Sequence, residues 1–187
     1  MSERIYIFKG FERFWHWAQA ALIITLLLTG FEIHGSYKLF GFYKALDTHT
    51  TAAWALIGLW VFAIFWHVTT GEWRHYIPTT DKLLVIARYY ASGIFRGEPH
   101  PFKPSSLNKH NPLQRLTYLG ILVCVLYFYG SWKAWGLETL SLEAVAVAHT
   151  VGAFLMLAFL ISHLYLVTTG RTPTAHLKAM VTGWEEH

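Results

Sequence analysis

The sequence predicts an all-α fold: a transmembrane bundle of four helices, with an amphipathic helix lying in the membrane interface between the second and third spans. Two observations support this prediction. Of the 187 residues, 54% are hydrophobic and only 14% are charged, whereas soluble domains carry about 25% charged residues. Four long stretches also lack Asp, Glu, Lys and Arg, and a membrane-spanning helix needs roughly 20 mostly apolar residues.

The four uncharged stretches lie at 14–31, 48–71, 116–132 and 144–170. With flanking residues, we expect spans at about 14–33, 48–71, 113–133 and 143–170. Their unbroken apolar character favours helices, because the strands of a membrane barrel alternate between apolar and polar residues. One domain, 1–187, accommodates all four spans.

The segment between the second and third spans contains the expected interfacial helix. Residues 82–95 combine Lys82 and Arg88 with apolar side chains, which is typical of a helix lying in the plane of the interface. Gly97 and three prolines follow and are expected to end it.

The distribution of Lys and Arg predicts the orientation. Twelve lie in the amino-terminal segment, in the segment 71–115 and in the carboxyl-terminal tail, whereas the remaining loops hold three. By the positive-inside rule, both termini are expected in the cytoplasm. The formal charge of +4 is then a topology signal. Because the basic residues are dispersed among apolar ones, we expect membrane lipid and no nucleic acid as a partner.

Histidines inside the spans are the main functional signal, because ionisable residues within a membrane are rare and usually functional. They are His16, His49, His67, His149 and His163. His16 and His163 are expected at one depth, and His49 and His149 at the other. His149 and His163 are 14 residues apart, which is about 21 Å along a helix, and they point within about 40° of each other. The fourth span therefore presents two stacked sites, each completed by another helix.

Two imidazoles that face each other across an apolar bundle suit a planar haem with both axial positions filled. Zinc or copper takes three or four ligands, often with carboxylate or thiolate. The single Cys124 excludes a c-type haem attachment motif and a cluster ligated by cysteines alone. His67 is an alternative ligand at the depth of His16, or part of a quinone site. Arg13 precedes His16 by one helical turn and is a candidate to hold a haem propionate, its alternative role being a cytoplasmic topology charge.

Several motifs resemble a known family. They are Arg13-Phe14-Trp15-His16-Trp17, His49, the run from Asn111 to Tyr118, and His149-x13-His163-Leu164-Tyr165 with Thr168-Thr169-Gly170 and the tail from His176 to Glu185. Together they resemble the bacterial cytochrome b561 family of di-haem membrane subunits, which includes the cytochrome b subunits of nickel–iron hydrogenase, formate dehydrogenase and thiosulfate reductase.

The resemblance implies two haem b groups, with His16 and His163 as the axial ligands of the inner haem and His49 and His149 as those of the outer haem. It also implies a protein of the bacterial inner membrane that exchanges electrons between quinone and a partner, expected to be a periplasmic catalytic or multihaem cytochrome subunit. The chain is then an electron-transfer subunit, the membrane anchor of a respiratory oxidoreductase, rather than a complete enzyme.

Two other functions fit the same spans. One is a free-standing superoxide:quinone oxidoreductase of the same fold, which the acidic excess of the outer loops, with three Lys against four carboxylates, disfavours. The other is a transporter that uses the histidines as a proton or metal relay and would be colourless when purified.

Overall fold

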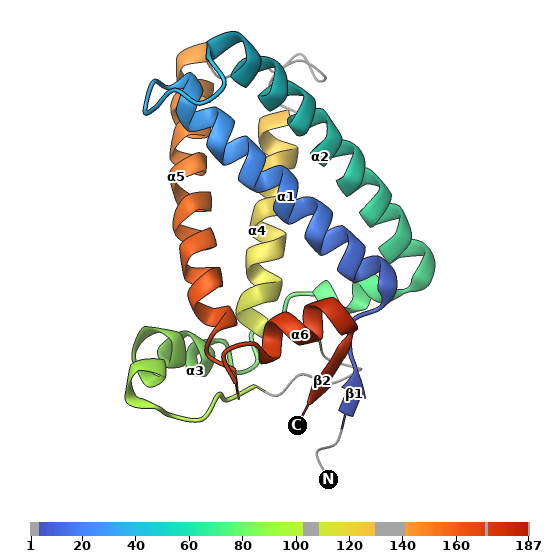
Figure 1. Cartoon of the computed structure of the whole chain (residues 1–187). Helices are drawn as coiled ribbons and strands as arrows, with labels where there is room; N and C mark the ends of the chain where they lie inside the picture. The colour runs from blue at the N-terminus through green and yellow to red at the C-terminus, as the bar shows by residue number, and fades with distance from the viewer. Residues whose placement is uncertain (1–3, 103–108, 130–140, 171, 187) are drawn as a thin grey trace. The chain divides into compact units, whose positions relative to one another are not determined.

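Helices dominate the computed structural model (Figure 1), which describes residues 4–102, 109–129, 141–170 and 172–186. The chain forms two compact units. The first combines Met1–His67 with Ala148–His187, and the second is Val68–Val147. The first unit contains all the histidines that the sequence pairs.

Three long helices form the frame of the first unit: α1 (Gly10–Ile33), α2 (Phe42–Thr70) and α5 (Leu142–Val167). Helix α1 contacts both of the others. Gln19 Oε1 accepts a hydrogen bond of 2.8 Å from Trp60 Nε1 on α2, and the ring of Phe31 lies 5.3 Å from that of Phe154 on α5. Phe11, early in α1, stacks on Trp66, late in α2, and His16, early in α1, faces His163, late in α5. Helix α1 therefore runs antiparallel to both helices.

Within the described part of the chain, α1, α2 and α5 are the three helices that are long and apolar enough to cross a membrane. These helices match the ranges predicted as spans at 14–33, 48–71 and 143–170 to within a few residues, except that α2 begins at Phe42, six residues early. That they cross a membrane at these bounds stays a prediction. The predicted span 113–133 falls on α4 (Pro112–Tyr129) in the second unit, and its last residues lie outside the described ranges.

The early start of α2 has a local cause at Glu32, near the end of α1. Glu32 Oε1 accepts hydrogen bonds of 2.7 Å from three consecutive backbone N–H groups, those of Leu39, Phe40 and Gly41. These groups lie in the turn directly before α2. The carboxylate therefore joins the end of one helix to the start of the next.

The two ends of the chain are tied together at the beginning of α1. Strand β1 (Arg4–Tyr6) pairs with β2 (Trp184–Glu186) in an antiparallel ribbon, and the rings of Tyr6 and Trp184 lie 5.2 Å apart. The prediction of an all-α fold was wrong in this detail. Two three-residue strands at opposite ends of a chain leave no periodic pattern in the sequence.

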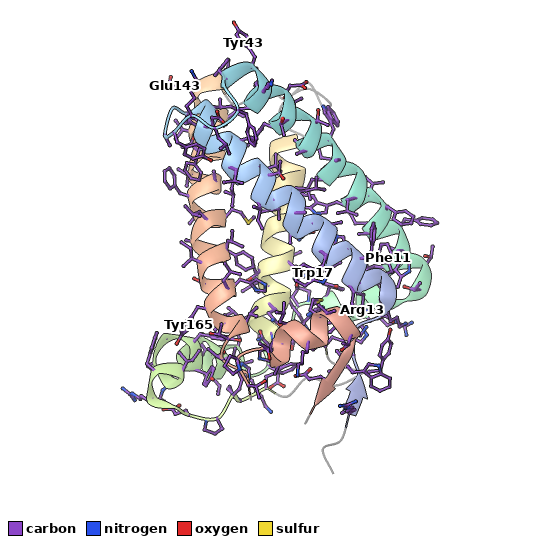
Figure 2. All side chains as sticks on the ribbon, viewed as in Figure 1. Phe11, Arg13, Trp17, Tyr43, Glu143 and Tyr165 are labelled. Carbon is purple, nitrogen blue, oxygen red and sulfur yellow. The ribbon has the colours of Figure 1, made fainter. Side chains whose placement is uncertain are left out.

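Helix α6 (Ala175–Thr182) is held against α1 by side chains of the longer helix (Figure 2). An Arg13 guanidinium N–H donates to the Val181 carbonyl, and Trp17 Nε1 donates to the Met180 carbonyl at 3.3 Å. These carbonyls belong to the last turn of α6, where no intrahelical donor remains for them. The amino-terminal part of α1 therefore caps the carboxyl-terminal helix.

The second unit holds the segment predicted to be an interfacial helix. Residues 83–96 are helical but irregular: α3 (Leu83–Arg88) continues into a π-helical turn, η2 (Tyr89–Gly93), and a 3₁₀ turn, η3 (Ile94–Arg96). Gly97 ends the segment in the left-handed conformation, at a φ of 69°. The helix and its end are as predicted, and its position in a membrane interface stays a prediction.

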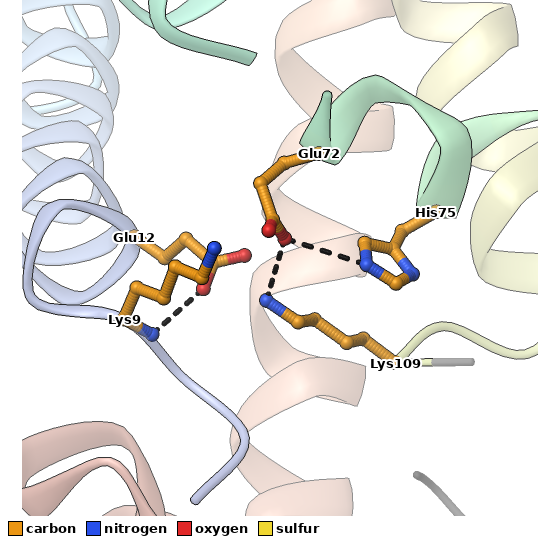
Figure 3. A network of polar contacts seen from close by, with 5 residues as sticks. All are labelled: Lys9, Glu12, Glu72, His75 and Lys109. Atoms are coloured by element: carbon orange, nitrogen blue, oxygen red, sulfur yellow. Dashed lines mark hydrogen bonds and ion pairs between the residues drawn. The ribbon is translucent and has the colours of Figure 1, made fainter. Parts of the chain in front are cut away.

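A buried ion pair marks the first turn of the second unit, η1 (Glu72–Tyr76). Figure 3 shows Glu72 Oε2 between Lys109 Nζ at 2.8 Å and His75 Nε2 at 3.4 Å. Both Glu72 and Lys109 are buried, so losing either partner leaves an uncompensated charge. The ion pair links Lys109, in the segment before α4, to Glu72, in the turn that follows α2.

Gly183 offers a test of the terminal ribbon. Its φ is 88°, and a Cβ there would lie 2.5 Å from Tyr6 Cε2 and 2.6 Å from the Phe8 carbonyl oxygen. Gly183→Ala adds this clash to a backbone cost of about 1–2 kcal/mol. We expect a lower melting temperature and faster proteolysis of both termini.

Gly35→Ala is the matched control, because Gly35 has a φ of 79° but no described atom within 4 Å of the added Cβ. Equal loss of thermal stability in the two variants would show that the added Cβ at position 183 does not clash with Tyr6 and Phe8.

Candidate functional site

The first candidate site lies where α1 begins and α5 ends. The imidazole rings of His16 and His163 have centroids 6.1 Å apart and planes inclined at 52°. Trp17 lies edge-on to His16, with centroids 5.1 Å apart, and Phe159 stacks on His163 at 5.7 Å. His16 Nδ1 is buried and has no hydrogen-bond partner among the described residues. The pair is thus set among aromatic rings, with a buried nitrogen left available.

The second candidate site lies at the other end of the same helices. The rings of His49 on α2 and His149 on α5 have centroids 6.2 Å apart and planes inclined at 71°. A pocket adjoins the pair and is lined mainly by apolar residues of α1 and α5, with His34, Ser36 and Thr150 adding polar groups. The structure therefore brings together both pairs that the depths of the histidines predict.

The spacing of both pairs fits haem iron. A metal–imidazole bond is about 2 Å long and a ring nitrogen lies about 1.1 Å from the ring centre, so two imidazoles on opposite sides of one metal ion have centres roughly 6.3 Å apart. The observed separations are 6.1 and 6.2 Å. Each pair offers two nitrogen donors, and two axial donors are what a bis-histidine haem takes from a protein.

Two neighbours of His49 on α1 were missed by sequence reasoning. Thr29 is fully buried, and its Oγ1 lies 3.0 Å from His49 Nδ1. Next to it, a Cβ on Gly30 would lie only 3.3 Å from His49 Cε1. Threonine and glycine are common in apolar helices, so nothing local distinguishes these two residues. Thr29 could have been found only as a polar residue of the first span at the same depth as the predicted ligand His49.

Gly58 on α2 and Gly152 on α5 also lie in the helices that carry the paired histidines. An added Cβ on either glycine meets no described atom within 4 Å. Among the described residues, neither glycine is therefore required for helix packing, whereas Gly30 lies against a histidine ring.

Arg13 lies one turn before His16 and contacts α6 through the Val181 carbonyl. Its Nε is buried without a hydrogen-bond partner among the described residues. The guanidinium has five N–H donors, so contact with α6 leaves donors for a second acceptor. Arg13 thus combines a structural contact with a buried donor close to the His16–His163 pair.

His67, the alternative ligand, lies in an aromatic cluster. Its ring is edge-on to those of Trp15 and Trp66, at 5.2 and 5.0 Å. Its Nδ1 lies 2.6 Å from the Ala63 carbonyl oxygen of its own helix, which is the acceptor expected of a packed histidine with a proton on that nitrogen. His67 is buried, and its contacts favour a packing role between α1 and α2.

Comparisons with known proteins identify the family of this chain. The family described as prokaryotic cytochrome b561 matches residues 7–183. "Putative cytochrome YdhU" of Escherichia coli is 32% identical over all of this chain and 76% of its own length. "Putative protein-methionine-sulfoxide reductase subunit YedZ1" of Azospira oryzae is 25% identical over 89% of this chain and 93% of its own length. No solved structure matches. The chain therefore belongs to the prokaryotic cytochrome b561 family of membrane cytochromes.

Proposed function

We propose that this protein is a di-haem b-type cytochrome that transfers electrons between membrane quinone and a partner redox subunit. The single observation that carries the proposal is the spacing of the His16–His163 and His49–His149 rings, 6.1 and 6.2 Å between centroids. Membership of a membrane cytochrome family supports haem b as the group held between them.

In this proposal, each bound haem b supplies a one-electron redox centre. The chain supplies ligation, spacing and surroundings. His163 and His149 lie 14 residues apart on α5, which separates the two sites by about 21 Å along the helix. A hydrocarbon layer is about 30 Å thick, so two sites at this spacing carry an electron across much of a membrane. Arg13 directs its remaining donors to a haem propionate.

The first prediction concerns the number of haems. We expect a reduced-minus-oxidised difference spectrum typical of haem b and a ratio near two haems per chain. His16→Ala and His49→Ala each remove one axial ligand, so each ratio should fall to about one. The measurement is haem extraction and quantification against protein concentration.

His67→Ala is the matched control, because it removes a buried histidine of the same helices and should leave both haems in place. Loss of a haem from this variant but not from His16→Ala would overturn the assignment of His16. A colourless protein would overturn the whole proposal and favour a histidine relay.

We further propose that the chain is a single four-helix membrane domain, in which α4 supplies the remaining span and the segment 83–96 lies in the interface. Both termini face the cytoplasm of a bacterial inner membrane. The pairing of β1 with β2 supports a common side for the two termini.

Topology can be tested with reporter fusions. An alkaline phosphatase fusion after His187 should be inactive and a fluorescent protein at the same position should be bright, because only the latter folds in the cytoplasm. Insertion of the phosphatase at Ser36, between α1 and α2, should give the opposite result. Reversed activities would place the His49–His149 pair on the cytoplasmic side.

The partner is proposed to be a catalytic or multihaem subunit outside the membrane. The Azospira oryzae relative is named as a reductase subunit, which supports a complex rather than a free-standing enzyme. Mild solubilisation of native membranes should therefore co-purify this chain with a second redox protein, detected by mass spectrometry. If the chain isolated alone oxidises superoxide and reduces quinone, this would favour the free-standing alternative.

A further inference from the structure

We propose that Thr29 is a positioning residue for His49: its hydroxyl oxygen accepts the Nδ1 proton of His49 and so directs the unprotonated Nε2 toward His149. This inference rests on the proposed haem site at the His49–His149 pair. It concerns how the chain prepares one of its two sites, and it starts from a contact on α1, which contributes no ligand to that pair.

The direction of the hydrogen bond follows from counting protons. A threonine hydroxyl has one hydrogen to donate and two lone pairs to accept with. Thr29 Oγ1 lies 2.7 Å from the Thr25 carbonyl oxygen and 3.3 Å from that of Leu26, and carbonyl oxygens only accept. The single hydrogen is therefore used within α1. At 3.0 Å from His49 Nδ1, the hydroxyl oxygen is left to accept, and we therefore assign the proton to Nδ1.

The tautomer decides which nitrogen can bind a metal. In a neutral imidazole, the nitrogen without the proton holds the free lone pair. With the proton fixed on Nδ1, His49 presents Nε2 as a ligand. An acceptor on the far nitrogen also orients the ring and raises the basicity of the ligating one. Hydrogen bonding of this kind is one of the means by which a protein tunes a haem potential.

The surroundings hold Thr29 rigidly in this role. Its side chain is fully buried, so water does not compete for the hydroxyl. The neighbouring Gly30 leaves the space that the His49 ring occupies, since a Cβ there would come within 3.3 Å of Cε1. Of these two consecutive residues of α1, Thr29 fixes the proton of the His49 ring and Gly30 leaves room for the ring itself.

The His16–His163 pair lacks this arrangement at His16. His16 Nδ1 is buried and has no hydrogen-bond partner among the described residues. The two sites are therefore prepared differently, and a change at Thr29 should affect only one of them. This makes the other site an internal control within the same protein.

The test uses the purified full-length protein with its haems. Thr29→Val keeps the shape of the side chain and removes the hydroxyl. Without the acceptor, His49 is a weaker donor to the ferric state, so the midpoint potential of one haem should rise while the other is unchanged. A tenfold change in the ferric-over-ferrous preference corresponds to about 59 mV for one electron. The affinity of the protein for the same haem should fall about 10-fold or more.

Two variants separate the hydrogen bond from general packing. Thr29→Ser restores the hydroxyl and should restore the wild-type potentials and the low-spin ferric spectrum in electron paramagnetic resonance. Thr25→Val removes a hydroxyl with the same bond to its own helix, 2.8 Å to the Ala21 carbonyl, and should leave both potentials unchanged. His49→Ala identifies the affected haem by its absence.

The outcomes are distinct. Wild-type potentials and spectra in Thr29→Val would overturn the inference, as would equal shifts in Thr29→Val and Thr25→Val, or haem loss in Thr29→Ser as complete as in Thr29→Val. If the wild type holds no haem, or if His49→Ala keeps both, the failure lies with the proposed function and not with Thr29.

Discussion

The imidazole rings that the apolar helices bury against one another organise the first unit. A polar group in hydrocarbon costs several kcal/mol when it is left unpaired. His67 is paired with a backbone carbonyl and aromatic edges, at 2.6 Å from the Ala63 oxygen. His49 has Thr29 at one nitrogen and His149 facing its ring. His16 and His163 face each other at 6.1 Å. The helices come together where these rings meet.

Helix α1 is the element on which both sites depend, although it supplies only one of the four paired histidines. At one end it carries His16, and Arg13 and Trp17 hold α6 in place. At the other end, Thr29 contacts His49, and Glu32 gathers the backbone N–H groups before α2. A rotation of α1 about its axis would therefore disturb one histidine pair, a hydrogen bond to the second pair, the end of α6 and the turn before α2.

The histidine pairs could be predicted because span order and the spacing of 14 residues fix both depth and face. The structure shows that the rings of each pair face each other. Their role as haem ligands stays a prediction. The ribbon of β1 and β2, the Thr29–His49 bond and the cap at Glu32 could not be predicted, because each joins residues whose proximity depends on tertiary packing. The start of α2 was placed late because Lys44 and Asp47 are charged residues typical of a loop, whereas the structure has them within the helix.

The position of α5 in the chain has a consequence for biogenesis. Polypeptides emerge from the ribosome amino terminus first, so α1 and α2, which carry His16, Thr29 and His49, are synthesised before His149 and His163. Neither histidine pair can form until α5 has been translated. Strand β2 follows α5 in the chain, so the pairing of β1 with β2 becomes possible later still.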